Sequence, residues 1–557
     1  MSGMLILVTL LLPLSLIGFV NTRSGRWLVG IAALPALLSA VLNPTPVSLS
    51  LDWLLLGTHI GLDETGRQFL AASALVWLLA GVYAAESLRD NRNSVRFRVF
   101  FLLAMSGNFM LILAQDMATF YLGFTLMGLS AYGLVAHRAC VSARRAGRLY
   151  LSWTIFGEVM LFSALVLLAS TAGGTDFAML RNTDPPAAAV ALLVLGFGIK
   201  LALPGLHLWL PHSYAVAPGA GVAVLSGPMM AAGFLGWLRF LPPGSETLVP
   251  WGEFLIVIGL FGSLYGVAVG LFQDNPRVVL GYSSISKMGL LSAGFGISLA
   301  HPDSTPLLLS ALVIFTLHHL LVKSALFLAV DLLEPGRTQA WIRSGVILLA
   351  LALIGVPFTT GALSKTEIIT ALPASFSGFS GWLSLAGLTT TLLMARLAYL
   401  VWKPRSNRPA SSGLGVTAWT LLTIVILLLP WLITAPIGSV SETLPFLAGL
   451  ILSGLVWRYR PEKLTRLVGR IPPGDILQPF GRILRALSRL LAGSLQDISR
   501  FQAALAKPTR ATQPDDSGPA EPSPTPSQPK MWHWAGPLWS GLAIAVLLAL
   551  VLGYGAD

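Results

Sequence analysis

GFGIKLALPGLHLWLPHSYAVAPG, residues 196–219, begins as a hydrophobic run and then carries Lys200, two histidines and three prolines. A charged residue at the centre of a membrane-spanning helix costs about 2.5–3.5 kcal/mol on insertion scales. Prolines remove helical hydrogen bonds, and a broken helix at membrane depth is stable only inside protein or beside a water-filled cavity. The stretch therefore predicts a discontinuous transmembrane helix that lines an ion path. The alternative is a proline-kinked helix whose lysine reaches the lipid headgroups.

The composition of the whole chain also indicates a membrane protein. Of the 557 residues, 55% are hydrophobic and 11% are charged, whereas soluble proteins have about 25% charged residues. The apolar runs are about 20 residues long, and only helices or closed barrels satisfy every backbone polar group in lipid. The sequence therefore predicts an all-α polytopic membrane protein. We expect no cleavable signal, and we expect residues 4–20 to remain as the first span.

Charge and cysteine usage exclude two classes of function. The net charge of +12 does not indicate a nucleic-acid partner, because the basic residues lie in short loops between apolar runs. The single cysteine, Cys140, excludes an iron–sulfur cluster or a disulfide within the chain. We therefore expect no cofactor, no metal site and no catalytic or redox centre.

Apolar segments that are long enough to span a bilayer recur along the chain. We expect about 16 spans, near 4–22, 26–43, 67–86, 99–115, 117–136, 149–171, 188–210, 219–240, 251–272, 277–299, 306–333, 342–373, 380–402, 415–434, 440–457 and 532–554. Basic loop residues such as Arg145 follow odd-numbered spans, and acidic ones such as Asp184 lie mainly in the opposite loops. The positive-inside rule then places the basic loops in the cytoplasm and both termini outside. We expect a multi-pass protein of the bacterial cytoplasmic (inner) membrane.

The C-terminal tail departs from this pattern. In residues 473–506 the apolar positions recur every three or four residues with arginines between them, which predicts a cytoplasmic amphipathic helix. Its periodicity is compatible both with a helix on the headgroups and with one that braces a neighbouring subunit. Residues 507–530 are polar and proline-rich and predict a disordered linker. Residues 531–557 predict a final span that opens with an aromatic belt.

The chemistry is expected at the few ionisable residues within apolar spans. His319 and Lys323 are four residues apart and share one helix face, while His318 points about a quarter-turn away. Two titratable groups on one face can pass a proton along a water chain, and interhelical hydrogen bonding is the alternative role. Glu158 is the one carboxylate well inside a span of the first half. It needs a partner or an altered protonation state.

A second helix break is predicted at GVPFTTGALSKTE, where Pro357 and two glycines precede Lys365. The arrangement repeats that around Lys200, and paired interrupted segments in two halves indicate inverted repeats. Lys287 and Arg396 also lie within apolar spans. The predicted proton path comprises Glu158, Lys200, His207, Lys287, His318, His319, Lys323, Lys365, Glu367 and Arg396.

At these motifs the sequence resembles a known family. KLALPGLHLWLPHSYAVAP, residues 200–218, is similar to the signature of the antiporter-like subunits of respiratory complex I, Mrp cation/proton antiporters and group 4 hydrogenases. The resemblance covers about residues 90–405, through DMATFYLGFTLMGLSAY, LSGPMMAAGFLGWLRF, GYSSISKMG, HHLLVKSALFL and GVPFTTGALSK. The sequence around LSGPMM and GYSSISKMG is most similar to that of hydrogenase-4-type membrane subunits.

The resemblance implies two inverted five-helix repeats, each with a broken helix that forms a half-channel. The implied domains are N-terminal transmembrane helices, the first repeat, the second repeat, peripheral transmembrane helices, an amphipathic lateral helix, a linker and a C-terminal helix. They correspond to residues 1–98, 99–240, 251–403, 415–457, 473–506, 507–530 and 531–557.

The first half-channel departs from the family pattern. The family's glutamate falls on Thr125 and the lysine of its next helix falls on Ala231, so that two usual charges are missing. Glu158, one helix later, is the candidate for a relocated partner of Lys200. The second half is more complete. Lys323 and Lys365 match the family's central and terminal lysines, His319 matches its histidine, and Lys287 replaces a frequent histidine.

The sequence therefore predicts a proton-translocating subunit of a larger energy-converting complex. Its expected partners are the lipid bilayer, other membrane subunits and a soluble energy-coupling module, with protons, or sodium or potassium, as the transported ions. One alternative is an Mrp-type cation/proton antiporter subunit, although the sparse polar core supplies few oxygen ligands for such ions. Another is a membrane anchor or proton channel for a soluble enzyme, such as one that hydrates carbon dioxide using the proton gradient. The missing charges at Thr125 and Ala231 favour the anchor somewhat.

Overall fold

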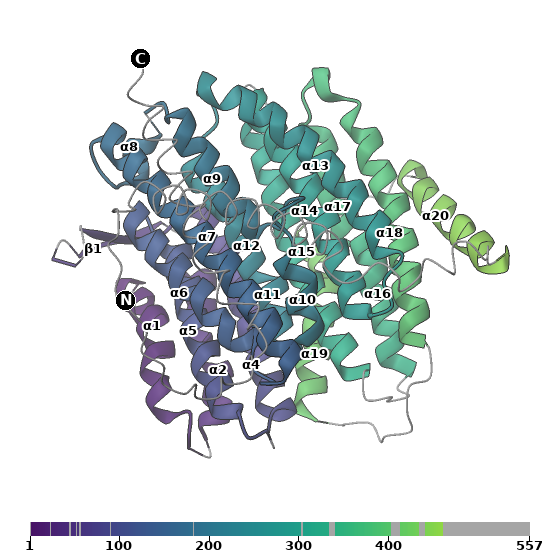
Figure 1. Ribbon diagram of the computed structural model, residues 1–557, viewed down its shortest axis with the longest axis horizontal. Helices are drawn as coiled ribbons and strands as arrows, with labels where there is room; N and C mark the ends of the chain where they lie inside the picture. The colour runs from purple at the N-terminus through teal and green to yellow at the C-terminus, as the bar shows by residue number, and fades with distance from the viewer. Residues whose placement is uncertain are drawn as a thin grey trace, which may run out of the picture. The chain divides into compact units, whose positions relative to one another are not determined.

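The computed structural model describes residues 2–459 except 23, 44–45, 52, 55–56, 90, 182, 302–304, 334–339, 403–412 and 434–439. The described part is a bundle of helices that run side by side, with one small hairpin of strands (Figure 1). The predicted amphipathic helix at 473–506, the linker at 507–530 and the final helix at 531–557 lie outside the described residues.

The chain begins with a group of helices and the hairpin. These elements are α1 (Ser2–Ser15), η1 (Leu16–Phe19), α2 (Gly25–Ile31), α3 (Leu34–Leu42), β1 (Val47–Leu51), β2 (Thr58–Leu62) and α4 (Glu64–Ser87). The strands pair antiparallel, with Val47 opposite Leu62 and Leu51 opposite Thr58. The sequence reading placed only a loop here and missed the hairpin, although VSLSL alternates between apolar and polar residues.

The first predicted repeat contains two interrupted helices. Its elements are α5 (Ser94–Leu113), α6 (Met117–Val135), α7 (Val141–Ala172), α8 (Phe177–Leu180), α9 (Ala187–Lys200), α10 (Trp209–Val216), α11 (Gly219–Ser226) and α12 (Pro228–Phe240). The interruption between α9 and α10 was predicted, but that between α11 and α12 was not. It occurs at Gly227, where a Cβ would lie 2.2 Å from the hydroxyl of Ser324 on α15. This close approach requires glycine at the position.

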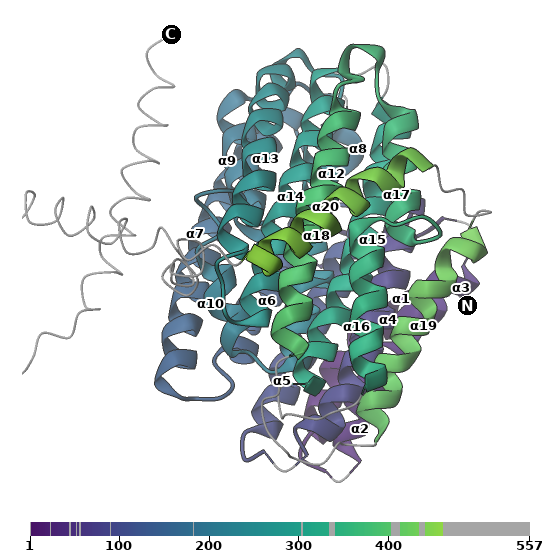
Figure 2. The same ribbon diagram turned by 90° about the vertical axis from the view of Figure 1, so that its right-hand side faces the viewer.

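The second predicted repeat and the peripheral helices follow. They are η2 (Glu246–Leu248), α13 (Val249–Gly270), α14 (Pro276–Ala300), α15 (Thr305–Leu333), α16 (Ala340–Ile354), α17 (Thr360–Ala371), η4 (Ala374–Phe376), α18 (Phe379–Trp402), α19 (Leu414–Ile433) and α20 (Val440–Tyr459). Helices α13 and α14 approach closely, since a Cβ on Gly259 would lie 2.5 Å from the carbonyl oxygen of Gly289. Such contacts between small residues are typical of membrane helix pairs. Helix α20 crosses α18 obliquely (Figure 2).

The predicted fold class is confirmed. Within the described residues, ten helical stretches are long and apolar enough to cross a membrane, and four shorter apolar helices accompany them. The number of 16 spans stays a prediction, because the last of them lies outside the described part of the chain.

A buried ion pair joins the two repeats to the N-terminal helices. Arg277, on α14, is only 1% exposed and donates hydrogen bonds to Asp331 on α15 and to the carbonyl of Ala217 between α10 and α11. Asp331 also accepts a hydrogen bond of 2.7 Å from the hydroxyl of Tyr83 on α4. Loss of one partner of such a pair leaves an uncompensated buried charge, which costs about 3–5 kcal/mol. These hydrogen bonds therefore hold the connection between α10 and α11 against α4, α14 and α15.

A second ion pair anchors the opposite end of α4. Asp63 caps this helix by accepting from the backbone N–H of Gly66 at 2.9 Å. It also accepts a bidentate pair of hydrogen bonds, of 2.6 and 2.7 Å, from the guanidinium of Arg239 on α12. Burial alone raises the pKa of Asp63, but the hydrogen bonds and charge of Arg239 outweigh it and hold the pKa below its ordinary value. The carboxylate therefore stays ionised and holds α4 to α12.

Candidate functional site

The break between α9 and α10 satisfies its own freed backbone groups. Helix α9 ends at Lys200, and the chain turns through Ala202 and Gly205, which have positive φ angles of 56° and 85°. The carbonyl of Ile199, near the end of α9, accepts hydrogen bonds of 2.8 Å from the indole N–H of Trp209 and of 3.1 Å from the backbone N–H of Ala202. A broken helix is stable at membrane depth only with such replacements. Trp209 therefore stabilises the break together with the backbone hydrogen bonds of the turn.

Lys200 lies inside the protein. Its side chain is 6% exposed, and its ammonium donates to the hydroxyl of Tyr150 on α7 at 3.1 Å. Tyr150 in turn donates to the carbonyl of Gly128 at 3.0 Å. The ammonium is also 5.5 Å and 5.9 Å from the ring centres of Tyr150 and Phe124, a range in which cation–π attraction stabilises a charge. The alternative of a lysine that reaches the headgroups is wrong.

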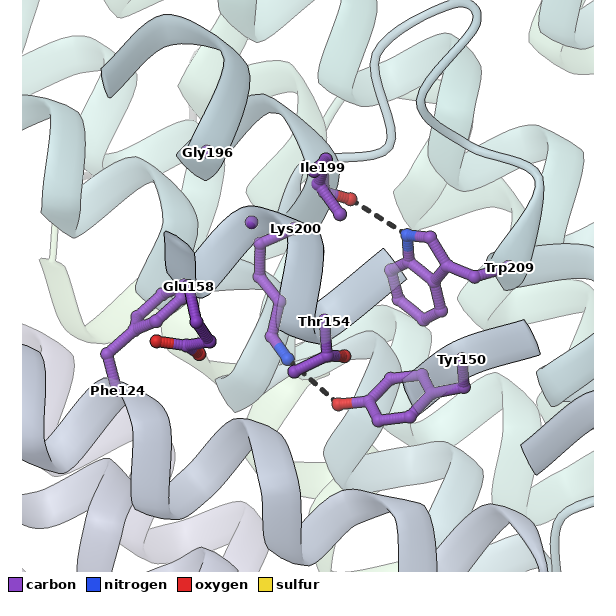
Figure 3. A pocket seen from close by; sticks show the side chains of 9 residues that line it. Phe124, Tyr150, Thr154, Glu158, Gly196, Ile199, Lys200 and Trp209 are labelled. Carbon is purple, nitrogen blue, oxygen red and sulfur yellow. Dashed lines mark hydrogen bonds between the residues drawn. The ribbon is translucent and has the colours of Figure 1, made fainter. Parts of the chain in front are cut away.

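Glu158 and Lys200 face one small cavity, which they enter from α7 and α9 (Figure 3). The cavity offers about 10 Å³ to the centre of a water molecule, which is close to the minimum for one water. Its lining also includes Phe124, Tyr150, Thr154, Gly157, Gly196, Ile199 and Trp209. Among the described residues no ion pair within 4.0 Å joins the carboxylate to the ammonium. Their pairing at a longer distance stays a prediction.

Thr125, which stands where the family resemblance places a glutamate, contacts the carboxylate of Glu158. Its hydroxyl donates to Oε2 of Glu158 at 2.5 Å, so the carboxyl group lies beside the position where the family resemblance places a glutamate. Oε1 of Glu158 is buried and has no hydrogen-bond partner among the described residues. Ala231, which stands where the family resemblance places a lysine, is 3% exposed and carries no charge. The first half therefore holds a carboxylate and a lysine in the same cavity, but from different helix positions.

A cluster of phenylalanine rings adjoins the cavity. Phe124 lines the cavity, and its ring is 6.2 Å from that of Phe120 and 5.4 Å from that of Phe197. These rings pack against Phe177 and Phe240 at centroid distances of 5.1–6.2 Å. The last two directly follow the charged residues Asp176 and Arg239 at helix ends. Phe124 therefore links the cavity lining to a cluster of apolar rings near the start of α8 and the end of α12.

His207 lies in the break itself. It is fully buried, and its Nε2 is 3.2 Å from the hydroxyl of Tyr265 on α13. The tautomer decides which atom donates. The sequence reading placed His207 in the path but missed Tyr265, which ties the break to the first helix of the second repeat.

In the second half, four predicted residues lie together on α14 and α15. Lys287, His318, His319 and Lys323 are all at most 5% exposed. The ammonium of Lys323 donates to the carbonyl of Leu280 at 2.8 Å. Helices α14 and α15, which carry these four residues, pack against each other. The structure therefore brings these basic groups into one buried cluster.

Lys365 lies at the second predicted break. Helix α16 ends at Ile354, and α17 begins at Thr360 after two residues with positive φ angles, Gly355 at 84° and Phe358 at 67°. The half-buried ammonium of Lys365 donates to the carbonyl of Ile354 at 2.5 Å. It therefore lies at the C-terminal end of α16, where the helix dipole favours a cation.

Two predicted residues lie apart from these clusters. Arg396 donates to the carboxylate of Asp274 at 2.9 Å and to the carbonyl of Gln273 at 3.0 Å. Because the side chain of Asp274 is 61% exposed, this contact is at the surface. Glu367 is half-buried on α17, and its side chain forms no ion pair within the described part of the chain. The place of both residues in a proton path stays a prediction.

Comparison with known proteins shows which family, relatives and solved structures this chain is similar to. The membrane-domain family described as NADH:quinone oxidoreductase/Mrp antiporter matches residues 114–394. An uncharacterised protein of Mycobacterium tuberculosis is 28% identical over 502 residues, which cover 80% of this chain and 76% of that protein. Hydrogenase-4 component B of Escherichia coli is 29% identical over 331 residues, covering 55% of this chain and only 49% of that protein. In the structure of the Mrp complex from Dietzia sp. DQ12-45-1b, one chain has the same fold, with a TM-score of 0.71 and 20% identity. The match covers 100% of this chain and 63% of that one.

Proposed function

The chain belongs to the NADH:quinone oxidoreductase/Mrp antiporter membrane-domain family, and from this premise we propose that it translocates protons within a larger energy-converting complex. It is an antiporter-like subunit with many membrane-spanning helices. The observation that carries the proposal is the recurrence of one arrangement, a lysine beside a broken helix, which is buried at Lys200 and half-buried at Lys365. Ionisable groups inside a membrane are costly and mark ion paths.

The proposed path in the second half runs along buried basic groups. Lys323 and Lys287 lie near His319 and His318, and the charge of Lys365 also acts on His318. Lysine and histidine exchange protons, and neighbouring groups of this kind form relays in transporters. In the first half, Lys200 would store a proton and Glu158 would tune it. Energy would come from partner subunits, and the domain division predicted from the sequence is part of this proposal.

Two alternatives remain as outcomes of the same experiment. An Mrp-type antiporter subunit is favoured by the fold of the Mrp complex chain. A membrane anchor or proton channel for a soluble enzyme is favoured by Thr125 and Ala231, which lack the family's charges.

The test uses the intact complex, isolated through the full chain and reconstituted in vesicles with a pH-sensitive dye inside. An imposed membrane potential is expected to drive proton flux at the same rate with or without sodium, because the buried clusters hold proton-exchanging groups. A flux that requires sodium or potassium would support the antiporter alternative. Vesicles that pass no protons would support the anchor and contradict proton translocation.

We further propose that the basic loops face the cytoplasm. Arg145 and Asp184 are both exposed. Arg145 lies near the start of α7, and Asp184 follows its end, between α8 and α9. The exposed Cys140 would first be replaced by alanine, since it would otherwise react. An impermeant maleimide is then expected to label Arg145→Cys only from the cytoplasmic side and Asp184→Cys only from outside. The reverse labelling would overturn the orientation.

A further inference from the structure

A hydrogen bond joins two helices of the second half at a point that the sequence did not indicate. Nδ1 of His318, on α15, is 2.7 Å from the hydroxyl of Thr360, on α17. Both side chains are 5% exposed. The other ring nitrogen of His318, Nε2, is buried and has no partner among the described residues. One side of the imidazole is therefore fixed by Thr360, while the other side is open to proton exchange.

Thr360 lies between the histidine and the second helix break. It is the first residue of α17, five positions before Lys365. A Cβ on Gly355 would lie 2.8 Å from the ammonium of Lys365 and 3.1 Å from the carbonyl of Gly361. Both groups therefore lie against Gly355, and the ammonium lies beside the first turn of α17, which begins at Thr360. The charge of Lys365 acts on His318 from this side, and that of Lys287 acts on it as well.

A threonine hydroxyl can serve as a relay because it donates one hydrogen bond and accepts others, and it rotates freely. A protonated His318 would transfer its Nδ1 proton to the hydroxyl oxygen while the hydroxyl proton leaves toward the neutral amine of Lys365. The threonine is then unchanged, His318 has lost one proton and Lys365 has gained one. Hydroxyl rotation returns the relay to its starting state.

We propose that Thr360 is the proton relay between His318 and Lys365. The inference rests on the proposed function of the chain as a proton-translocating subunit. The competing role is structural, because the same bond would also dock α17 onto α15. The two roles differ in what they require, since docking needs only a bond of the right geometry and relay needs an exchangeable hydroxyl proton.

The test compares three variants in the reconstituted complex. Thr360→Val keeps the shape but removes the hydroxyl, and proton flux is expected to fall about 100-fold, within the range for loss of a proton-transfer group. Thr360→Ser restores the hydroxyl and is expected to restore flux to within about twofold of the wild type. The matched control is Thr316→Val on α15, since Thr316 is also buried but donates to the carbonyl of Leu312 in its own helix. Wild-type flux in Thr360→Val, or equal loss in the serine and valine variants, would overturn the relay.

A second readout separates this inference from the proposed function. With ¹⁵N-labelled histidine, the signal of His318 is identified by its loss in His318→Gln, and it reports which ring nitrogen carries the proton. Thr360→Val is expected to shift this signal, and Thr316→Val is not. An unshifted signal would contradict the His318–Thr360 contact itself. If the wild-type complex passes no protons while the signal shifts as expected, the contact holds, and the proposed function and the relay both fail.

Discussion

Replacing Lys365 with alanine is expected to reduce proton transport by the complex at least about 100-fold and to leave its membrane assembly intact. The ammonium lies at the break between α16 and α17, where it donates to the carbonyl of Ile354. As the terminal proton site of the second half, it has no neighbour to replace it. Assembly should persist because the side chain is only half-buried, so water can reach the freed carbonyl.

Two further variants are compared with Lys365→Ala. Thr370→Ala changes an exposed hydroxyl on the same helix and is expected to transport protons at the wild-type rate. His319→Ala should slow transport less than Lys365→Ala, because water can partly bridge the gap to Lys323. The measurement is the dye response of reconstituted vesicles, with the amount of assembled complex determined in parallel. Undiminished flux in assembled Lys365→Ala complex would remove this lysine from the path.

Arginine at position 365 tests what the site requires. A guanidinium keeps the positive charge but does not release its proton in a protein. If Lys365 acts by proton exchange, Lys365→Arg should be as inactive as the alanine variant. If it acts only through its charge, the arginine variant should retain activity. Gly355 and Gly387 lie close to the ammonium, so assembly of this variant must also be measured.

The sequence predicted the breaks because their physical signals are local. Prolines and glycines beside a lysine in an apolar run are costly in an uninterrupted helix, and both breaks occur where these residues lie. The third break, at Gly227, has a similar local signal in the dipeptide Gly227–Pro228. A proline is well tolerated as the first residue of a helix, which is its position in α12.

The hydroxyl partners could not be predicted in the same way. Tyr150, Tyr265 and Thr360 each contact a predicted site residue in another segment of the chain. The spacing of residues along one helix predicts which of them share a face, but not which neighbouring helix that face meets. In apolar spans the hydrophobic pattern is also weak, since residues on every side are apolar. Contacts between helices therefore required the structure.

The first half-channel has few charged residues, and its activity depends on whether Glu158 pairs with Lys200. Glu158 and Lys200 face one cavity, and Thr125 holds the carboxylate by a hydrogen bond of 2.5 Å. We expect the two charges to lie about 4–8 Å apart, directly or through one water. At roughly 6 Å and an effective dielectric constant of about 20, their attraction is about 3 kcal/mol. Such a pair would hold the lysine charged where an isolated ammonium is costly.

Glu158→Gln is therefore expected to impair proton transport strongly, by up to about 100-fold if the full attraction is lost. The substitution keeps the size of the side chain and its ability to bond Thr125, so assembly should be unchanged. Thr125→Val is the matched control for that hydrogen bond, and its effect should be much smaller. Wild-type transport by Glu158→Gln would show that the carboxylate does not act on Lys200.

The double variant Glu158→Gln with Thr125→Glu is expected to recover part of the lost transport. Position 125 lies within hydrogen-bond distance of the present carboxylate, so a glutamate there returns a negative charge to the same cavity. Thr125→Glu alone should instead impair transport, because it places two carboxylates in a space with room for about one water. The two substitutions would then compensate each other, as measured by proton flux in all four combinations. If the double variant is no more active than Glu158→Gln alone, the carboxylate of Glu158 is not a relocated substitute for the family's glutamate.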